Sequence, residues 1–401
     1  MASRFRPTHG RARVSELRRI VITWMATARG GAEQSSLDLC AALARRYQLD
    51  VTLLLWRHNT EFPITDSADF QLRVCAGGES YRRTLAGLLT DEPGHTALFS
   101  NHRAFQIDLP LAAQAGVPCG VIFRESPLPE EALRTIAAPD ASALVYRRGP
   151  ELDWARLAQA AALIGVSDFC ARQIRQYAPA HTAVIRIYNG IAGTPPLAPP
   201  PAPPCRRFVI VSRLIGWKAV DFGIAAFARL WRRYPDARLQ IAGEGEEEPR
   251  LRGLAAGLLP EGVVSFLGFR TGIDSVFAGN DFLLHLSPIE SFGRVIAEAG
   301  LHGLPAIAPQ SAGAGELIID GHTGLTFRPG DADDCLRILA SACEMSADIH
   351  QQLAQNAARR ARALFNLDRA VEEYAGLASA MLHERAGSGG QRYRHFTPPQ
   401  S

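Results

Sequence analysis

The sequence predicts an α/β protein built from two domains whose sheets face each other across a cleft. Three observations lead to this prediction. Residues 18–56 read as a strand, a glycine-rich turn, a helix and a strand, which is the building block of a parallel sheet. A proline-dense segment at 191–206 can form neither a helix nor a central strand, so we expect a stiff extended linker there. A second α/β unit begins directly after it, at residue 207.

The first domain is predicted over residues 18–190. Residues 18–24 form a short apolar run typical of a buried parallel strand. Residues 33–46 place apolar side chains at helical spacing, and residues 51–56 form a second apolar strand. Further predicted elements are strands at 97–100, 119–123, 161–166 and 183–187, and a helix near 108–115.

The second domain is predicted over residues 207–365. A strand at 207–211 is followed by a loop and a helix at 220–233. Further predicted strands lie at 237–242, 263–266, 282–286 and 305–308, and two helices are expected within 349–383, the last of them in a separate segment at 366–385. Two end segments complete the chain: a basic arm at 1–17, and a tail at 386–401 whose Gly, Ser, Gln and Pro content predicts disorder.

The composition is that of a globular protein, with 47% hydrophobic and 21% charged residues. No apolar run reaches the roughly 18 residues of a spanning helix, and the run at 20–23 is too short for a secretory signal, so a cytoplasmic location is expected. A net charge of +3 is too small to indicate nucleic-acid binding. The seven cysteines form no C-x-x-C pair and are odd in number, which favours reduced buried thiols over disulfides or a zinc site.

One basic residue differs from all the others. Of 43 lysines and arginines, 42 are arginine, and the single lysine is Lys218. Lysine carries a compact point charge on a thin stem, whereas arginine presents a planar fork. A site that needs the compact charge would retain lysine in an arginine-rich protein.

The segment at 279–300 is the richest in candidate site residues. A predicted strand ends near Leu286, and Gly293 opens a helix that carries Glu298. The backbone amides of 291–295 therefore lie at a helix N-terminus, where phosphate binds favourably. Glu290 and Glu298 are eight residues apart, which is roughly 12 Å along a helix. This is about the reach from the sugar to the ribose of a nucleotide sugar.

This segment resembles the E-x7-E motif of family-4 glycosyltransferases, which have the GT-B fold of two Rossmann-like domains. Here the motif reads Glu290-SFGRVIA-Glu298. The chain also resembles the family at several other segments: VSRLIGWKAVD at 211–221, IAGEG at 241–245, FLGF at 266–269, SAGAGE at 311–316, DGHTG at 320–324, GGAE at 30–33, Val166-Ser167 and Asn189-Gly190. The resemblance implies that the C-terminal helices pack back on the N-terminal domain.

The resemblance also implies roles for individual residues. Arg213 and Lys218 would neutralise the diphosphate, Glu298 would hold the ribose hydroxyls, and Glu290 would contact the donor sugar. Removing Lys218 would then abolish donor binding with the fold intact. The implied catalytic group is Glu290, Arg213 and Lys218, and the implied donor-binding set is Gly30, Gly31, Arg213, Lys218, Gly268, Phe269, Glu290, Ser291, Phe292, Gly293, Arg294 and Glu298.

The chain departs from the family pattern at three places. Ser291 replaces a glycine and suits a helix N-terminus, and Ala219 follows Lys218 where the family usually has glycine. Arg124 stands where many members carry a histidine that positions the donor sugar. His102, Arg124 and Glu125 are therefore the acceptor-side candidates.

The predicted function is that of a retaining glycosyltransferase. It would move a sugar from a UDP- or GDP-sugar to a hydroxyl of a carbohydrate or lipid-linked acceptor, in bacterial surface polysaccharide or glycolipid assembly. No cofactor and no metal are expected, since the resemblance implies a metal-independent enzyme. The acidic run Asp331-Ala-Asp333-Asp334 is interpreted as the start of a helix.

Two alternatives remain open. One is another GT-B enzyme, such as a nucleotide-sugar epimerase or a phosphorylase, and the other is a catalytically weak GT-B subunit that binds nucleotide or partner proteins. A separate hypothesis is peripheral contact with the inner face of an anionic membrane, through the arm at 1–17 and the arginine pairs at 45–46, 82–83 and 147–148.

Overall fold

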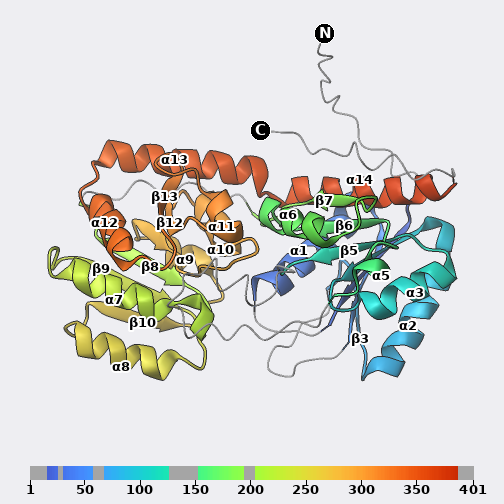
Figure 1. Cartoon of the computed structure of the whole chain (residues 1–401), viewed down its shortest axis with the longest axis horizontal. Helices are drawn as coiled ribbons and strands as arrows, with labels where there is room; N and C mark the ends of the chain where they lie inside the picture. Colours follow the sequence, from blue (N-terminus) through green and yellow to red (C-terminus); the bar gives the residue numbers. More distant parts are fainter. Residues whose placement is uncertain (1–15, 26–29, 57–66, 126–151, 194–203, 387–401) are drawn as a thin grey trace, which may run out of the picture.

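The computed structural model describes residues 16–25, 30–56, 67–125, 152–193 and 204–386. In this part of the chain, two parallel sheets with flanking helices lie side by side, and two helices run along one side of both (Figure 1). This confirms the predicted two-domain α/β architecture. The arm, the central part of the linker, the tail and the Arg147–Arg148 pair lie outside the described residues.

The N-terminal sheet has seven strands in the order β3-β2-β1-β4-β5-β6-β7, and every described pair is parallel. The strand order reverses at β1, which pairs with both β2 and β4. At such a point the loops beyond the carboxyl ends diverge and leave room for a ligand. The strands are β1 (Arg19–Trp24), β2 (Asp50–Leu55), β3 (Gln71–Val74), β4 (Thr96–Asn101), β5 (Cys119–Phe123), β6 (Ala162–Gly165) and β7 (Val184–Arg186).

Helices cover both faces of this sheet, because parallel strands need crossover connections. Ser167 begins one of them by accepting a hydrogen bond from the amide of Cys170, which satisfies a free N–H of the first turn. The helices are α1 (Gly31–Tyr47), α2 (Gly78–Thr90), the short η1 (Pro93–His95), α3 (Phe105–Ala115), α5 (Trp154–Leu157) and α6 (Asp168–Tyr177).

The C-terminal sheet has six parallel strands in the order β10-β9-β8-β11-β12-β13, and its order reverses at β8. The strands are β8 (Arg207–Val211), β9 (Arg238–Ala242), β10 (Val264–Gly268), β11 (Phe282–Leu284), β12 (Ala306–Pro309) and β13 (Gly324–Phe327). The helices are η2 (Gly216–Lys218), α7 (Val220–Trp231), α8 (Glu248–Leu258), α9 (Ile273–Phe277), α10 (Arg294–Leu301), α11 (Ala312–Leu317), α12 (Ala332–Cys343) and α13 (Ala347–Leu364).

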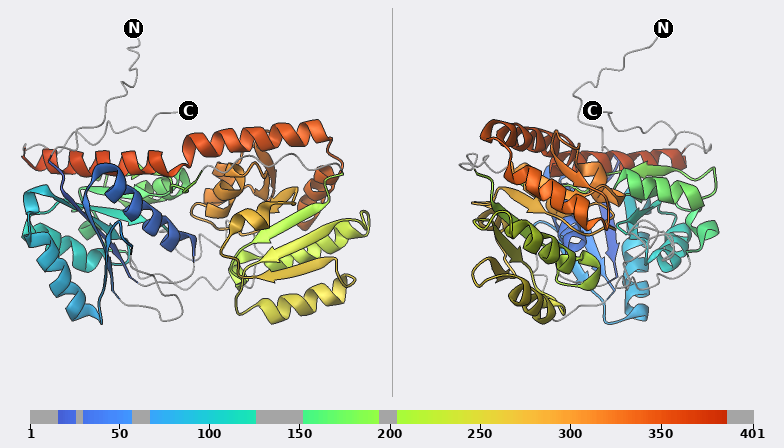
Figure 2. Two further views of the ribbon diagram at one scale, coloured as in Figure 1. Left: turned by 180° about the vertical axis from the view of Figure 1, so that it is seen from behind. Right: turned by 60° about the vertical axis from the view of Figure 1, so that its left-hand side comes forward.

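The last helix, α14 (Leu367–Ala386), returns to the N-terminal domain (Figures 1 and 2). It packs against α1 and β4, as the GT-B resemblance implied. The chain passes between the domains where Ile191 and Asn366 form a bridge, and a Cβ at Gly190 would lie 2.7 Å from the Cα of Leu367. Glycine at 190 therefore permits the close approach of α14.

Apolar packing also joins the two domains. The ring of Phe292, from the segment before α10, lies 6.0 Å from Tyr188 and 5.6 Å from Phe365, and Tyr188 and Phe365 are 5.2 Å apart. All three residues are buried in one cluster that includes side chains from both sheets and from α14. Burial of three aromatic rings at the junction stabilises one relative placement of the domains.

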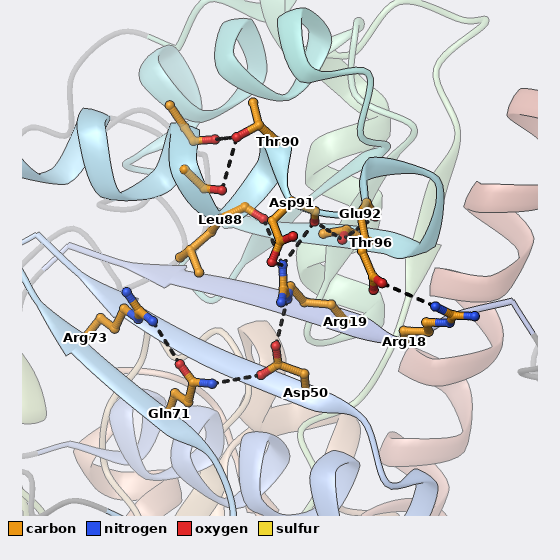
Figure 3. A network of polar contacts seen from close by, with 12 residues as sticks. Arg18, Arg19, Asp50, Gln71, Arg73, Leu88, Thr90, Asp91, Glu92 and Thr96 are labelled. Carbon is orange, nitrogen blue, oxygen red and sulfur yellow. Dashed lines mark hydrogen bonds and ion pairs between the residues drawn. The ribbon is translucent and has the colours of Figure 1, made fainter.

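The amino-terminal edge of the N-terminal sheet, which faces away from the other domain's strand ends, is held by exposed and half-buried ion pairs (Figure 3). Arg19 Nε donates to Asp50 at 2.7 Å and its Nη1 donates to Asp91 at 2.8 Å. Arg18 pairs with Glu92 at 3.2 Å on the surface. Arg19 thus forms ion pairs with two carboxylates, those of Asp50 and Asp91.

The sequence located most strands to within two or three residues but missed β3 and β13. Helix α1 begins at Gly31, two residues before the predicted start, and the edge strand β3 was not predicted because most of its side chains are exposed. The seven cysteines are all free and buried, which confirms the prediction of structural thiols. Within the described residues, no helix combines the length and apolar character that crossing a bilayer requires.

Candidate functional site

A cleft of about 2390 Å³ lies between the two domains and is lined by residues from both. Its walls are the segments that follow the carboxyl ends of β1, β4 and β5 on one side and of β8, β9 and β11 on the other. All the residues predicted from the sequence line this cleft except Gly268. Gly268 has φ 68° and directly precedes Phe269, so it turns the chain that exposes the Phe269 ring.

Lys218 lies on the C-terminal wall and makes an ion pair with Glu290. The Lys218 Nζ lies 3.9 Å from the centroid of the Trp217 ring, which adds a cation–π contact. Burial lowers the pKa of the Lys218 ammonium, and Glu290 offsets this only in part. Burial raises the pKa of the Glu290 carboxyl, but Lys218 and His285 outweigh it, so this pKa lies below the usual range.

Arg213 stands beside this pair at the end of β8. Its Cζ lies 5.8 Å from the Trp217 ring, and its charge acts on both Lys218 and Glu290. Two glycines allow the β8 and β9 ends to approach here: a Cβ at Gly243 would lie 1.8 Å from the carbonyl of Ser212, and one at Gly245 would lie 2.2 Å from that of Leu214. The IAGEG segment thus supports the backbone that carries Arg213.

Ala219, directly after Lys218, adopts a left-handed conformation with φ 52° and ψ 37°. It ends the short helix η2 and begins α7. An L-residue with a Cβ is strained in this region, by about 1 kcal/mol relative to glycine. The structure therefore gives a physical reason for the family's glycine, and the change to alanine is a local cost in the loop that aims Lys218.

His285 is a neighbour of the ion pair that the sequence analysis did not single out. It is the first residue beyond β11, and its Nε2 lies 3.9 Å from the Glu290 carboxylate without a hydrogen bond. Burial lowers the pKa of His285 to about 4, so the ring is neutral at pH 7. Its position at a strand's carboxyl end was the available signal.

The segment 290–295 leads into helix α10, as predicted. Gly293 has φ 86°, and the amides that follow it open the helix toward the cleft. The loop is held from behind, because the amide of Gly313 donates to the carbonyl of Glu290 at 2.6 Å, and a Cβ at Gly313 would lie 2.2 Å from the Ser291 carbonyl. These contacts present the N-terminus of α10, with its partial positive charge, to the cleft.

Arg294 connects the two walls. Its Nε donates to Glu298 at 2.6 Å, its Nη2 to Asp38 of α1 at 2.9 Å, and its Nη1 to Ser35 at 2.8 Å. A Cβ at Gly31 would lie 3.0 Å from the Arg294 side chain, so glycine there makes room for this contact. Burial raises the pKa of Glu298, and Arg294 offsets this only in part.

A second polar contact joins the domains through Glu316. Its carboxylate accepts hydrogen bonds from the amides of Asp168 at 2.7 Å and Phe169 at 2.8 Å, at the start of α6. A carboxylate at a helix N-terminus satisfies free N–H groups and meets the positive end of the helix dipole. The acidic residue of the SAGAGE segment therefore acts between the domains.

The N-terminal wall contains His102 and Glu125. His102 is buried, its ring stacks on Phe123 at 5.4 Å, and its Nε2 lies 3.7 Å from Glu125. Glu125 also makes an ion pair with Arg103. Burial lowers the pKa of His102 to about 4, so this ring is also neutral at pH 7.

Arg124 is the most buried cation of this wall, with 7% of its surface exposed. Its Nη1 donates to the amide oxygen of Asn189, and its guanidinium lies 5.5 Å from the Trp24 ring. Its Nε is buried and has no hydrogen-bond partner. Within the described residues, no carboxylate lies within ion-pair distance of it, although the charge of Glu33 acts on it from the start of α1.

The acidic run at 331–334 forms a helix start, as interpreted from the sequence. The Asp331 side chain accepts from the amide of Asp334 and caps α12. Among the residues with a described placement, no group of three His, Cys, Asp or Glu side chains could hold a metal ion. Three of the described arginines of the membrane hypothesis have carboxylate neighbours: Arg45 pairs with Asp69, Arg46 with Asp368 and Glu372, and Arg83 with Glu79.

Comparison with known proteins finds one family whose model matches most of the C-terminal domain. Residues 203–360 match the family model of the glycosyl transferases group 1. N-acetyl-alpha-D-glucosaminyl L-malate synthase of Bacillus anthracis is 30% identical over 161 residues, which are 39% of this chain and 41% of that protein. Glycogen synthase of Pseudomonas syringae pv. syringae is 34% identical over 179 residues, 44% of this chain and 36% of that enzyme. The matches thus span less than half the length of these relatives.

Solved structures with the same architecture cover nearly the whole chain. Anabaena HepE in complex with UDP and glucose superposes with a TM-score of 0.67 at 21% identity, covering 89% of this chain and 98% of HepE. The pneumococcal O-GlcNAc transferase GtfA, in complex with UDP and GlcNAc, superposes with a TM-score of 0.73 at 12% identity, covering 92% and 99%. At these identities the likeness establishes the fold.

Proposed function

We propose that this chain, whose C-terminal domain belongs to the glycosyl transferases group 1 and whose two domains form the GT-B fold, transfers a sugar from a nucleoside diphosphate sugar to an acceptor hydroxyl. The observation that carries the proposal is the buried Lys218–Glu290 pair beside Arg213, at the N-terminus of α10 and inside the interdomain cleft. Cations, helix amides and a carboxylate meet there at one point.

The geometry supports one placement of the donor. Arg213, Lys218 and the amides at 291–295 offer positive charge and N–H donors for the diphosphate. Glu298 lies on α10 and lines the cleft, where it is proposed to bind the ribose hydroxyls, and the exposed ring of Phe269 offers a surface for the nucleobase. Glu290 then faces the sugar, with its carboxylate held in place by Lys218.

We further propose that transfer retains the anomeric configuration. The bond between the anomeric carbon and the diphosphate oxygen breaks, the acceptor oxygen forms a bond to the same carbon on the same face, and the acceptor proton passes to the departing phosphate oxygen. No protein nucleophile is needed. Arg213, Lys218 and the α10 amides stabilise the negative charge that develops on the leaving group, which is their contribution to rate.

The acceptor is proposed to enter from the N-terminal wall, where His102, Arg124 and Glu125 lie. A carbohydrate or lipid-linked acceptor, in surface polysaccharide or glycolipid assembly at the cytoplasmic side of a membrane, agrees with an open cleft of this size. This part of the proposal rests on the sequence resemblance and on the shape of the cleft.

The test is a panel of nucleoside diphosphates measured by thermal shift and calorimetry, followed by donor hydrolysis. We expect either UDP or GDP to raise the melting temperature, and its sugar conjugates to be hydrolysed slowly without acceptor. Arg229→Ala is the control, because Arg229 pairs with Asp333 on the surface and lies outside the cleft. A chain that binds no nucleoside diphosphate contradicts the proposal, and binding without hydrolysis or transfer favours a nucleotide-binding subunit instead.

A further inference from the structure

Arg124 differs from two part-buried arginines of the described chain, Arg19 and Arg294, in the partners that its guanidinium has. Arg19 donates to two carboxylates at 2.7 and 2.8 Å, and Arg294 donates to Glu298, Asp38 and Ser35. Arg124 is 7% exposed, yet among the described residues its one hydrogen-bond acceptor is the neutral amide oxygen of Asn189. A guanidinium has five N–H donors, so most of its hydrogen-bonding capacity is unused.

This arrangement is costly without a ligand. A buried cation is stabilised by a paired anion, and burial with only a neutral partner leaves a desolvation cost uncompensated. The Nε–H of Arg124 is buried and has no acceptor within the part of the chain that the structure describes. The Trp24 ring at 5.5 Å provides only a weak cation–π contact, and Glu33 acts on the guanidinium from beyond ion-pair distance.

The location of Arg124 links this unmet charge to a substrate. It is the first residue beyond β5, it lines the cleft, and the charges of Arg294 and Glu33 act on it. The charge of Arg213 on the opposite wall also acts on Glu33, so the Glu33 carboxylate interacts with both Arg124 and Arg213. The diphosphate has its own cations, Arg213 and Lys218, on the C-terminal wall.

The chemistry of the missing partner follows from the guanidinium itself. The guanidinium carries one positive charge, which Glu33 offsets only in part, so a ligand group with one negative charge suits it. The planar fork of an arginine matches the two oxygens of a carboxylate through parallel N–H···O bonds. A modest turn of the side chain, common when ligands bind, would bring Nε and an Nη group toward the cleft.

We infer that Arg124 binds a carboxylate of the transferred sugar or of the acceptor, so that this chain handles a uronate or another acidic substrate. The inference rests on the proposed function and names a substrate class for the same cleft. Two sources can supply the carboxylate, the glycosyl group of the donor or the acceptor, and the experiment separates them.

The first arm compares matched donors that differ only at one carbon: UDP-glucose with UDP-glucuronate, and GDP-mannose with GDP-mannuronate. If the donor supplies the carboxylate, we expect the uronate to bind the wild-type chain about tenfold more tightly, since a charge-assisted bidentate pair contributes at least this factor. Arg124→Gln should reduce the difference to about twofold, with affinity for UDP or GDP unchanged.

The second arm uses the neutral donor that the chain accepts and compares aryl glucosides with aryl glucuronides as acceptors. If the acceptor supplies the carboxylate, the glucuronide should have the higher kcat/KM by about tenfold, and Arg124→Gln should remove this through KM. Arg124→Lys keeps the charge but loses the fork, so an intermediate preference is expected in whichever arm responds.

Controls keep the test decisive if Arg124→Gln folds poorly. Arg19→Gln removes a part-buried arginine from the amino-terminal edge of the same sheet and should leave both preferences intact. The inference is overturned if neither arm shows a carboxylate preference, or if Arg124 variants weaken UDP or GDP as much as their sugars. Failure of the proposed function looks different, because then no nucleoside diphosphate binds at all.

Discussion

Lys218 and Arg294 on the C-terminal wall have carboxylate partners, whereas Arg124 on the N-terminal wall has a neutral one. On the C-terminal wall, Lys218 pairs with Glu290 and Arg294 pairs with Glu298 and Asp38. On the N-terminal wall, Arg124 is buried against the neutral amide of Asn189. Lys218 and Arg294 have carboxylate partners before any ligand arrives, whereas Arg124 has no carboxylate within ion-pair distance among the described residues.

This difference separates two tasks. A compensated pair holds its side chains in fixed positions, which preorganises a site for the charge that develops during reaction. An uncompensated cation gains most from a ligand that carries the missing charge, which makes it a source of specificity. Catalysis is thus proposed for the wall that the family model matches, and choice of substrate for the wall that it does not.

Removing Lys218 should have the largest effect on donor affinity and on stability. In Lys218→Ala we expect donor affinity to fall at least a hundredfold, because the diphosphate loses a cation and Glu290 keeps an unpaired charge near it. Stability should fall as well, by about 3 kcal/mol, since the buried Glu290 carboxylate loses its partner.

Calorimetry and chemical unfolding measure the two effects, and Lys218→Ala/Glu290→Gln is the matched variant. It should regain most of the stability but not the affinity. Full recovery of UDP or GDP affinity in the double variant would mean that Lys218 only neutralises Glu290.

Glu298→Ala tests the ribose end of the same wall. We expect nucleoside diphosphate affinity to fall about thirtyfold, or about 2 kcal/mol, because a carboxylate that accepts from vicinal hydroxyls is lost. The wild type should prefer UDP over 2′-deoxy-UDP, or GDP over 2′-deoxy-GDP, and the variant should not.

Arg294→Ala tests whether Glu298 acts on the ribose directly or by holding Arg294. It removes the side chain that Glu298 holds and that contacts Asp38 and Ser35 across the cleft. If Arg294→Ala alone abolishes the preference for the ribose form while Glu298→Ala retains it, Glu298 acts by anchoring Arg294 and the ribose assignment is wrong.

Each wall also contains one buried neutral histidine, and the two should share a pH dependence. Burial lowers the pKa of His102 and of His285 to about 4, and the ordinary value near 6.5 applies in the unfolded chain. Between these values the unfolded chain binds more protons, so stability is full above pH 6.5 and falls as the pH drops toward 4. We expect each histidine to cost about 1 to 2 kcal/mol at pH 5.

The groups around each ring differ and allow a check. His102 faces Glu125, Arg103 and Phe123, whereas His285 faces Glu290 and Lys218. Unfolding from pH 7 to 5 should show a shallower loss in His102→Gln and in His285→Gln. Burial raises the pKa of Asp108 to about 6, which acts in the opposite direction over pH 6 to 4, so Asp108→Asn should steepen the loss.

Ala219→Gly is the smallest expected effect. Relief of the left-handed strain at φ 52° should raise stability by about 0.5 to 1 kcal/mol, with donor affinity unchanged within about twofold. Ala42 of α1 provides a control, because Ala42→Gly in a helix interior should lower stability by a similar amount. Equal destabilisation by both glycines would contradict the strain at Ala219.

The sequence predicted residues on both walls of the cleft. Arg213, Lys218, Glu290 and Glu298 were assigned from local motifs, and each lies on the cleft. Such motifs are readable because they contain a strand end, a turn and a helix start within a few residues. Asp38 was missed because its partner Arg294 lies far along the chain. His285 was missed because Lys218, which acts on it together with the nearby Glu290, is distant in the sequence.

Phe292 lines the cleft, as predicted, and also packs at the junction of the two domains. The sequence placed it among the donor-binding residues, and it does line the cleft. Its ring, however, is buried against Tyr188 and Phe365 at the junction of the domains. Apolar burial between distant segments depends on the packed structure, which a motif does not encode.

By itself, the sequence determined the two α/β domains, most of their strands and the residues that would meet a diphosphate, because alternation of strands and helices and the chemistry of short motifs are local properties. Which charged side chains form ion pairs depends on the tertiary structure. It paired Lys218 with Glu290, set Arg294 against Asp38 and left Arg124 with a neutral partner. Compensation of charge depends on distances between segments far apart in the chain, and these exist only after the domains have packed together.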